Sequence, residues 1–249
     1  MKPLICIPTY NEIDNVELIA TAIFEHVETD IVFIDDGSPD GTGRKVDALA
    51  AANPRIHAIH RPAKLGLGTA YIKAFHWGLE RGYDVIFEMD ADFSHDPAHL
   101  PSFFRALAQG ADAVCGCRYM KGGGVSNWDK RRLLLSRGGS LYTFLWLWFG
   151  IRDWTGGFNA WRSEVLRNLS LDTIQSKGYT FQIEMKYRAL VKRFNVCEIP
   201  IVFQERRAGA SKMSGSIVKE ALWGVLRLRF RKERGQLFSR TNLALKHES

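Results

Sequence analysis

Two patterns of apolar residues alternate along most of the chain. Short runs of consecutive apolar residues are typical of buried strands, and apolar residues that recur every three or four positions are typical of helices. The runs predict strands at 3–8, 31–34, 56–59, 85–89, 111–117 and 196–202, with a further strand ending at Trp161. The helical spacing predicts helices at 16–27, 40–52, 69–81, 97–108, 180–192 and 216–230. This alternation predicts βαβ units, and therefore an α/β fold with a mostly parallel central sheet flanked by helices.

Carboxylates follow three of the predicted strands. Glu12 comes after the first strand, Asp35 and Asp36 after the second, and Asp90 and Asp92 after the fourth. Ligands of open α/β sheets bind at the carboxyl ends of the strands. Residues i and i+2 of an extended chain share a face, so Asp90 and Asp92 can point into one crevice. Two hard oxygen ligands suit Mg²⁺ or Mn²⁺, with water and substrate phosphate at the remaining positions, so we predict a metal–diphosphate site.

Helix capping is the simpler reading of these aspartates. Asp96 followed by Pro97 matches an N-cap with proline at the first helical position. This explains Asp96 but neither Asp90 nor Asp92. A D-x-D triplet alone is a weak signal, and Asp35-Asp36-Gly37 alone could be an ordinary turn. The recurrence of carboxylates at three strand ends favours a binding site.

The same edge carries groups suited to a nucleotide. Asp36 can accept hydrogen bonds from a base or ribose, and Tyr10 can offer a ring face for stacking. Arg118 follows the predicted strand 111–117, where its guanidinium could clamp phosphate oxygens. The sequence has neither G-x-G-x-x-G after the first strand nor G-x-x-x-x-G-K-[ST]. This excludes the two common nucleotide-binding fingerprints.

Composition and charge narrow the class of protein. The 249 residues are 46% hydrophobic and 24% charged, enough for one globular α/β domain with a small appendage. The formal charge of +7 favours anionic partners. The four cysteines have no C-x-x-C spacing and are expected to be reduced, and no signal-peptide pattern precedes the first strand. These features point to the cytosol.

Two later segments combine apolar and basic residues. The run 141–151 is too short to span a bilayer and predicts a buried or interfacial helix, preceded by the basic stretch 130–132. The predicted helix 216–230 is amphipathic and leads into a basic tail. Such helices either dock on the domain or lie on a membrane surface, and we expect a combination of the two.

The chain resembles family-2 glycosyltransferases, and more narrowly the polyprenol (dolichol) phosphate mannose synthases. The resemblance runs from Leu4 to about Phe230. Its more general motifs, shared among nucleotide-sugar glycosyltransferases, are PTYNE (8–12), IDDGSPDGT (34–42), KLGLGTAY (64–71) and MDADFSHDP (89–97). Its further motifs are CRY (117–119), WDKRRLLLSRG (128–138), TGGFNAWR (155–162), SKGYTFQIEM (176–185) and FQERRAGASKMS (203–214), of which the last four in chain order are much narrower.

The resemblance implies a GT-A fold, a GDP-mannose donor, a Mg²⁺ or Mn²⁺ cofactor and a polyprenyl (dolichyl) phosphate acceptor. It assigns the nucleotide-sugar site to Pro8, Tyr10, Glu12, Ile34, Asp36, Asp90, Ala91, Asp92, Arg118, Arg206 and Lys212. It assigns the acceptor phosphate to Arg118, Arg132 and Ser136, and the metal to Asp90, Asp92 and Ser94. Some family members carry glutamine in place of Ser94, and serine is a poorer ligand. The residues expected to carry catalysis are Asp90, Asp92, Arg118, Arg132 and Arg206.

We therefore expect a catalytic domain at 1–212 and an amphipathic helix with a basic, membrane-proximal tail at 213–249. The enzyme would invert the anomeric centre and work at the cytosolic face of a membrane, with a small membrane-anchoring subunit as a further partner. A sibling enzyme that uses UDP-glucose or another UDP-sugar is the first alternative. A non-catalytic basic nucleic-acid-binding protein is the second, but acidic residues at three strand ends would repel phosphates, so we expect no nucleic acid. An idle glycosyltransferase-like scaffold is the third.

Overall fold

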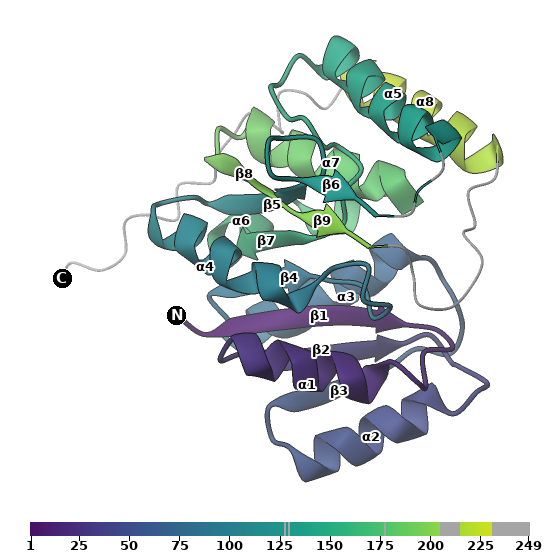
Figure 1. Cartoon of the computed structure of the whole chain (residues 1–249), viewed down its shortest axis with the longest axis vertical. Helices are drawn as coiled ribbons and strands as arrows, with labels where there is room; N and C mark the ends of the chain where they lie inside the picture. The colour runs from purple at the N-terminus through teal and green to yellow at the C-terminus, as the bar shows by residue number, and fades with distance from the viewer. Residues whose placement is uncertain (127, 129, 177, 205–214, 231–249) are drawn as a thin grey trace.

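The computed structural model describes residues 1–126, 128, 130–176, 178–204 and 215–230. Its centre is a seven-stranded sheet with the order β3-β2-β1-β4-β7-β5-β8 (Figure 1). Neighbouring strands are parallel except at β7, which runs antiparallel to β4 and β5. The strands are β1 (Pro3–Thr9), β2 (Asp30–Asp35), β3 (Ile56–His60), β4 (Val85–Glu88), β5 (Ala113–Cys117), β7 (Asn159–Arg162) and β8 (Val196–Pro200).

Alternation of side chains along the strands gives each face of the sheet its own core. In β1, Ile5 and Ile7 belong to one apolar cluster, whereas Leu4 and Cys6 belong to the other. The first face is covered by α1 (Val16–His26), α2 (Thr42–Ala52) and α4 (Leu100–Ala108). The second face is covered by α3 (Leu67–Glu80), α6 (Ser163–Asn168) and α7 (Gly178–Val191). The expected fold class, a mostly parallel sheet between helices, is confirmed.

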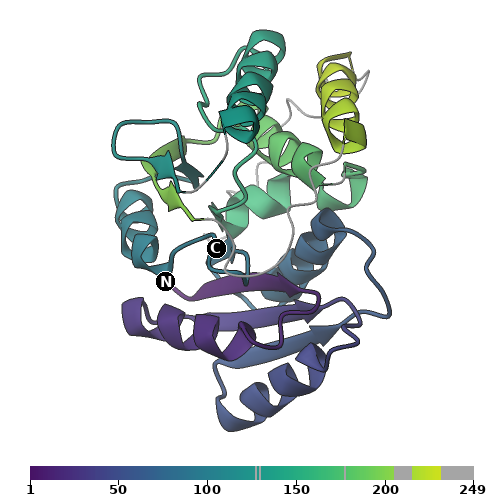
Figure 2. The same cartoon turned by 45° about the vertical axis from the view of Figure 1, so that its right-hand side comes forward.

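Two further helices, α5 (Lys130–Leu147) and α8 (Gly215–Phe230), lie outside these layers at one end of the molecule (Figures 1 and 2). Val225 and Leu228 of α8 are buried in a third apolar cluster with residues of α7. The Tyr142 hydroxyl of α5 donates to the Leu222 carbonyl of α8 at 3.3 Å. The predicted C-terminal helix therefore docks on the domain. No helix within the described ranges is long and apolar enough to cross a membrane.

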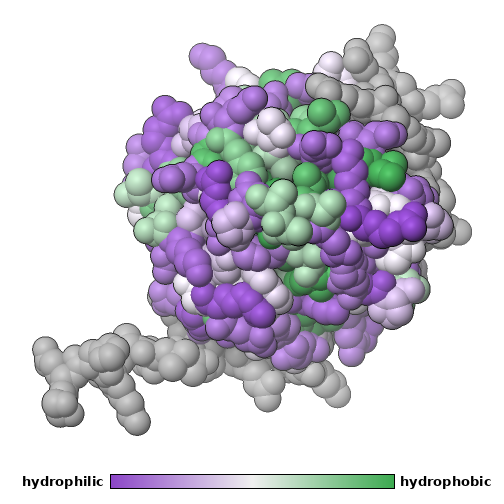
Figure 3. Space-filling model, turned by 90° about the horizontal axis from the view of Figure 1, so that it is seen from below, coloured by the Kyte–Doolittle hydropathy of each residue, from purple (hydrophilic) through white to green (hydrophobic). Residues whose placement is uncertain are grey.

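The two outer helices nevertheless leave large apolar side chains in solvent. Trp148, directly after α5, is 81% exposed and Trp223 of α8 is 74% exposed. We call the set the α5–α8 apolar surface: Leu134, Leu135, Leu141, Phe144, Leu145, Trp146, Trp148, Leu222, Trp223 and Phe230. The face of the molecule seen in Figure 3 is, by contrast, dominated by hydrophilic residues. Isolated exposed apolar residues are ordinary, but a set of this size on two neighbouring helices indicates an interaction surface.

The structure differs from the sequence prediction in several elements. The expected strand 196–202 is split at Ile201: β8 belongs to the main sheet, and β9 (Val202–Phe203) pairs with β6 (Gly124–Val125) in a separate two-stranded sheet. The expected helix 97–108 begins with a 3₁₀ turn at Pro97–His99. The apolar run 141–151 is helical only to Leu147. Neither α6 nor the small β6–β9 sheet was predicted, because six-residue and two-residue elements are too short to show periodicity.

Candidate active site

The chain after β4 forms a tight turn, residues 89–96, which we call the carboxylate loop. The Ser94 N–H donates to Asp92 Oδ1 at 3.0 Å, and Phe93 adopts a left-handed backbone with φ of 62°. Asp92 is buried, whereas the Asp90 side chain is 32% exposed. An aromatic residue with positive φ is strained, and such strain persists where surrounding contacts hold it.

The loop fits a divalent cation. The Ser94 hydroxyl oxygen is buried and has no hydrogen-bond partner, which is costly unless a ligand satisfies it. With the carboxylates of Asp90 and Asp92, it completes the expected set of hard oxygen donors. In the part of the chain that the structure describes, no cluster of three or more His, Cys, Asp or Glu side chains is placed to hold a metal. A cation here would therefore depend on water and substrate phosphate for its remaining ligands.

The nucleotide end of the predicted site lies at the same edge. β2, β1 and β4 are adjacent and parallel, so the residues that follow them share this edge. Lys64 lies over the Tyr10 ring at 4.4 Å from its centroid. The Glu12 carboxylate accepts from Asn15 at 2.7 Å, and Asp35 accepts from the Ser38 hydroxyl at 2.5 Å. Asp35 thus serves the local turn, as the simpler reading proposed.

Asp36 is held differently from Asp35. Its Oδ1 lies 3.2 Å from Nη1 of Arg61, and both side chains are buried. The pair is an ion pair without hydrogen-bond geometry, since neither atom has a hydrogen-bond partner. Burial raises the pKa of Asp36; Arg61 opposes this, and Asp35 adds to it. A buried carboxylate with an unused acceptor atom is suited to the N–H donors of a base.

Three other residues predicted to contact the nucleotide expose little of their side chains to a ligand. Ile34 and Ala91 are buried in the core, and Pro8 is partly buried. The Ile34 carbonyl lies 3.4 Å from the Thr9 hydroxyl. Any contact from Ile34 or Ala91 to a ligand would therefore come from the backbone. Arg206 and Lys212 lie outside the described residues.

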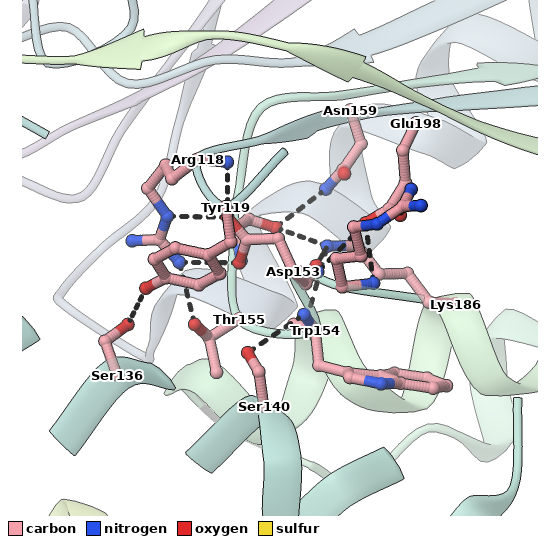
Figure 4. A network of polar contacts seen from close by, with 12 residues as sticks. Arg118, Tyr119, Ser136, Ser140, Asp153, Trp154, Thr155, Asn159, Lys186 and Glu198 are labelled. Carbon is pink, nitrogen blue, oxygen red and sulfur yellow. Dashed lines mark hydrogen bonds and ion pairs between the residues drawn. The ribbon is translucent and has the colours of Figure 1, made fainter. Parts of the chain in front are cut away.

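On the other side of the edge, Arg118 is buried against Asp153 (Figure 4). Its Nε and Nη2 donate to Asp153 Oδ2 and Oδ1 at 2.6 and 2.7 Å, and Nη2 also donates to the Thr155 hydroxyl at 2.8 Å. Burial is the largest single effect on the pKa of Asp153 and would raise it, but the charge and hydrogen bonds of Arg118, together with the charge of Lys186, hold that pKa below its usual value. The guanidinium predicted to clamp phosphate is thus oriented by a protein carboxylate.

The turn that carries Asp153 is anchored from three elements. Lys186 of α7 donates to the carbonyls of Asp153 and Gly156 at 2.7 and 3.0 Å. Glu198 of β8 accepts from the Asp153 N–H at 2.9 Å, and Ser140 of α5 accepts from the Trp154 N–H at 3.3 Å (Figure 4). A buried lysine with several carbonyl partners fixes a turn strongly. The position of Arg118 therefore depends on α5, α7 and β8 together.

Tyr119 contacts both Ser136 and Arg118. The Tyr119 hydroxyl donates to Ser136 Oγ at 2.6 Å, and the Arg118 guanidinium lies 5.2 Å from the Tyr119 ring centroid. Arg137 lies 5.5 Å from the same centroid. Arg132 belongs to α5, but its side chain is outside the described part. Two of the three predicted acceptor-phosphate residues are thus brought to one place.

Comparison with known proteins identifies the family. The chain matches the model of Glycosyl transferase family 2 over residues 4–170. The protein belongs to glycosyl transferase family 2. It is 48% identical to the polyprenol monophosphomannose synthase of Mycolicibacterium smegmatis over 231 residues, covering 90% of this chain and 87% of that protein. It is 47% identical to the undecaprenyl-phosphate mannosyltransferase of Micrococcus luteus over 228 residues, covering 91% and 93%.

Solved structures agree with the fold of this glycosyltransferase. Glucosyl-3-phosphoglycerate synthase from Mycobacterium tuberculosis, crystallised with Mn²⁺ and UDP-glucose, has a TM-score of 0.65 and 17% identity, covering 92% of this chain and 78% of that chain. At that identity the likeness bears on the fold alone. The expected GT-A fold is confirmed.

Several residues of the glycosyltransferase site escaped prediction. Asp153 holds Arg118, and Lys186 holds the turn that carries Asp153. Next to the carboxylate loop, the buried Glu88 accepts from Trp161 at 2.6 Å and from Gln182. Burial raises the pKa of Glu88 to about 7, against the effect of those two hydrogen bonds. A charged residue inside a predicted buried strand was the available signal for Glu88. Nothing local marks Lys186, because its partners come from a turn 30 residues earlier.

Proposed function

We propose that this family-2 glycosyltransferase moves mannose from GDP-mannose to a polyprenyl phosphate, giving a β-linked mannosyl phosphate lipid. The observation that carries the proposal is the placement of two kinds of group on one sheet edge. A buried carboxylate, Asp36, and the carboxylate loop suit a nucleotide diphosphate with its metal. Beside them, Arg118 lies near Ser136 of helix α5, and this helix carries part of the α5–α8 apolar surface. The names of two relatives that are 47% and 48% identical support the same reaction.

The donor would lie along the edge from Asp36 to Asp92. Asp36 would accept from the N1–H and amino groups of guanine, and Tyr10 would pack on the base. Asp90, Asp92 and Ser94 would hold Mg²⁺ or Mn²⁺. The bound ion would neutralise the diphosphate that leaves with the nucleotide. Arg206 and Lys212, from the segment after β9, would add positive charge to the same diphosphate.

The acceptor needs no strong general base, because its phosphate is already an anion. One of its oxygens forms a bond to the anomeric carbon of mannose while the bond from that carbon to the diphosphate oxygen breaks, and the electron pair leaves with GDP. Attack opposite the leaving group inverts the anomeric centre. Arg132 would contact the acceptor phosphate directly. Arg118, fixed by Asp153, and Ser136, fixed by Tyr119, would complete its site.

The α5–α8 apolar surface would place the enzyme on a membrane. Its aromatic residues, Trp146, Trp148 and Trp223, are of the kind that lie at the lipid headgroup level. Arg227 is exposed on α8 beside Trp223 and suits anionic lipids. The acceptor tail would run along this surface while its phosphate reaches Ser136. We propose association with the cytosolic face, with or without a small membrane-anchoring subunit.

A donor panel tests the reaction. Purified protein is offered GDP-mannose, UDP-glucose or UDP-GlcNAc with a short polyprenyl phosphate and Mg²⁺ or Mn²⁺, and the lipid product is analysed by chromatography and mass spectrometry. We expect mannosyl phosphate lipid from GDP-mannose alone. Product from a UDP-sugar alone would replace the donor in the proposal. No lipid-linked sugar from any donor would refute it.

A further inference from the structure

His95 lies in the carboxylate loop but has no role in the reaction described above. It is buried between two aromatic side chains from different parts of the chain. Its ring stacks on Phe158 with 4.9 Å between centroids and 19° between planes, and it meets Phe203 edge-on at 5.6 Å. Burial of an imidazole between two rings fixes its orientation, and this orientation determines which nitrogen faces the loop.

The nitrogen that faces the loop holds the backbone of a proposed metal ligand. The Asp90 N–H donates to His95 Nδ1 at 3.0 Å. The Asp90 carboxylate is farther away, with Oδ2 at 3.9 Å from Nδ1. An Nδ1 that accepts a hydrogen bond carries no proton, so the ring proton lies on Nε2. His95 therefore holds the main chain of Asp90 and leaves its carboxylate to point elsewhere.

A second set of contacts holds His95 itself through β9. The His95 and Phe203 backbones form an antiparallel bridge, and the Gln204 N–H donates to the Ser94 carbonyl at 3.2 Å. The Gln204 side-chain amide donates to Asp96 Oδ2 at 3.3 Å. The carboxylate loop is thus tied to the last described residues before the segment that carries Arg206 and Lys212.

Phe203 also contacts residues near the proposed acceptor-phosphate site. Its ring meets Trp128 edge-on at 5.4 Å, and the Arg118 guanidinium lies 5.6 Å from its centroid. One ring therefore contacts both His95, which holds the carboxylate loop, and Arg118, which is held by Asp153. Such an arrangement fixes two groups of the site relative to each other.

We propose that His95 is a positioning residue: its Nδ1 sets the direction in which Asp90 and Asp92 face a divalent cation, and Phe203 keeps the ring in place. The inference rests on the metal-dependent transfer proposed above. The loop needs such support, because the left-handed backbone at Phe93 is strained. The turn at Asp92 and Ser94 holds one end of the loop, and His95 holds the other.

Two substitutions separate this role from simple packing. His95→Phe keeps an aromatic ring between Phe158 and Phe203 but has no acceptor for the Asp90 N–H. His95→Asn loses the ring, but its Oδ1 stands about as far from the backbone as Nδ1 and can still accept. Mn²⁺ affinity is measured for wild type and both variants by electron paramagnetic resonance of free Mn²⁺ with saturating GDP. Thermal unfolding and steady-state kinetics are measured on the same samples.

We expect His95→Phe to weaken Mn²⁺ binding and to lower kcat/KM for the donor by about tenfold each, the effect typical of lost support to a metal ligand. The acceptor KM should change less than about twofold, and the Tm should stay close to that of wild type. His95→Asn should keep Mn²⁺ affinity within about threefold although its Tm falls. If His95 positions Asp90, His95→Asn should bind Mn²⁺ more tightly than His95→Phe although its Tm is lower. If His95 only fills space, the variant with the lower Tm should also bind Mn²⁺ less tightly.

Unchanged Mn²⁺ affinity in His95→Phe would overturn the inference, and so would losses that follow Tm in both variants. The binding measurement requires no transfer of sugar. Wild-type protein that binds Mn²⁺ with GDP but makes no lipid product would therefore refute the proposed function. The Mn²⁺ affinities of the two variants would still test the role of His95. Wild-type protein that binds no Mn²⁺ would refute the role of His95 together with the metal site.

Discussion

Arg118 and Asp153 form a bidentate ion pair with two N–H···O bonds of 2.6 and 2.7 Å, and both side chains are buried. A guanidinium held in this way cannot swing to follow a ligand. In the proposed site, the acceptor phosphate would therefore have to come to the position that Asp153 defines. This relationship gives the first prediction.

Asp153→Asn should damage both folding and acceptor use. Leaving the buried Arg118 charge without its partner should cost about 3 kcal/mol of unfolding free energy. The acceptor KM should rise about tenfold, with the donor KM changed much less. Chemical denaturation and kinetics with each substrate varied in turn measure these effects. Arg152→Gln is the control, since the Arg152–Glu198 pair is largely exposed on the arginine side and should matter little. A larger change in the donor KM than in the acceptor KM would move Arg118 to the donor site.

Asp92→Ala should abolish transfer and leave the fold intact, because it removes a proposed metal ligand. The matched control is Asp96→Ala in the same segment. Asp96 accepts from the Ala98 N–H at 2.9 Å and caps the 3₁₀ turn, so its loss should cost about 1 kcal/mol of stability but retain transfer. Product formation and Tm of both variants decide between metal binding and capping. Full turnover by Asp92→Ala would end the metal-site assignment.

Arg132→Ala should raise the acceptor KM by at least about tenfold with a smaller effect on the donor KM, because it removes the proposed charged hydrogen bond to the acceptor phosphate. Initial rates at varied lipid phosphate and varied GDP-mannose measure the two constants. Arg105→Ala, an exposed arginine of α4, is the control for loss of charge alone. If the donor constant rises more, Arg132 belongs to the diphosphate site.

His99 predicts a pH dependence of stability. Burial lowers its pKa from 6.5, against the opposing effect of Asp96, and its Nε2 accepts from the Val202 N–H at 3.1 Å. The unfolded chain takes up the proton at about 6.5, before the folded one does, so this contribution to stability is present above that pH and is lost as the pH falls through the folded pKa. The wild-type Tm should therefore fall between pH 7.5 and 5.

His99→Gln should flatten this dependence, because its amide oxygen can accept from Val202 and does not titrate. The control is His76→Gln, an exposed histidine paired with the exposed Asp172. The Tm of the three proteins is compared at each pH. An identical fall in wild type and His99→Gln would show that another group titrates.

Trp223→Glu should reduce membrane binding by at least about tenfold, since burying one large apolar side chain is worth about 1.5–3 kcal/mol. Co-sedimentation with vesicles of neutral and anionic lipid measures it. Leu18→Glu is the control: Leu18 is 53% exposed on α1, at the other end of the molecule from α8 (Figure 1). Equal effects of the two substitutions would remove the α5–α8 apolar surface from the proposal.

The parts of the site that follow strands could be predicted from sequence, because strand ends are visible as the end of an apolar run. Asp36, Asp90 and Arg118 were placed on one edge in this way. The protein partners of these side chains were not predicted: Arg118, for example, is held by Asp153 from a turn 35 residues later. Long-range pairs of this kind leave no periodic signal. The strand ending at Trp161 was predicted, but the antiparallel direction of β7 was not, because that direction depends on the strands beside it.

The reversed direction of β7 has an architectural consequence. A strand that runs against its neighbours brings the turn before it, instead of the turn after it, to the shared edge. The turn with Asp153 thereby faces loops that belong to the amino-terminal strands. In the proposed function, the loops of the first half would bind the nucleotide and the turn from the second half would bind the acceptor, so acceptor choice could change by exchange of second-half loops that leave Phe158 and Phe203 in place. Chimaeras joined between β4 and β5 would be the natural way to give this scaffold new acceptors.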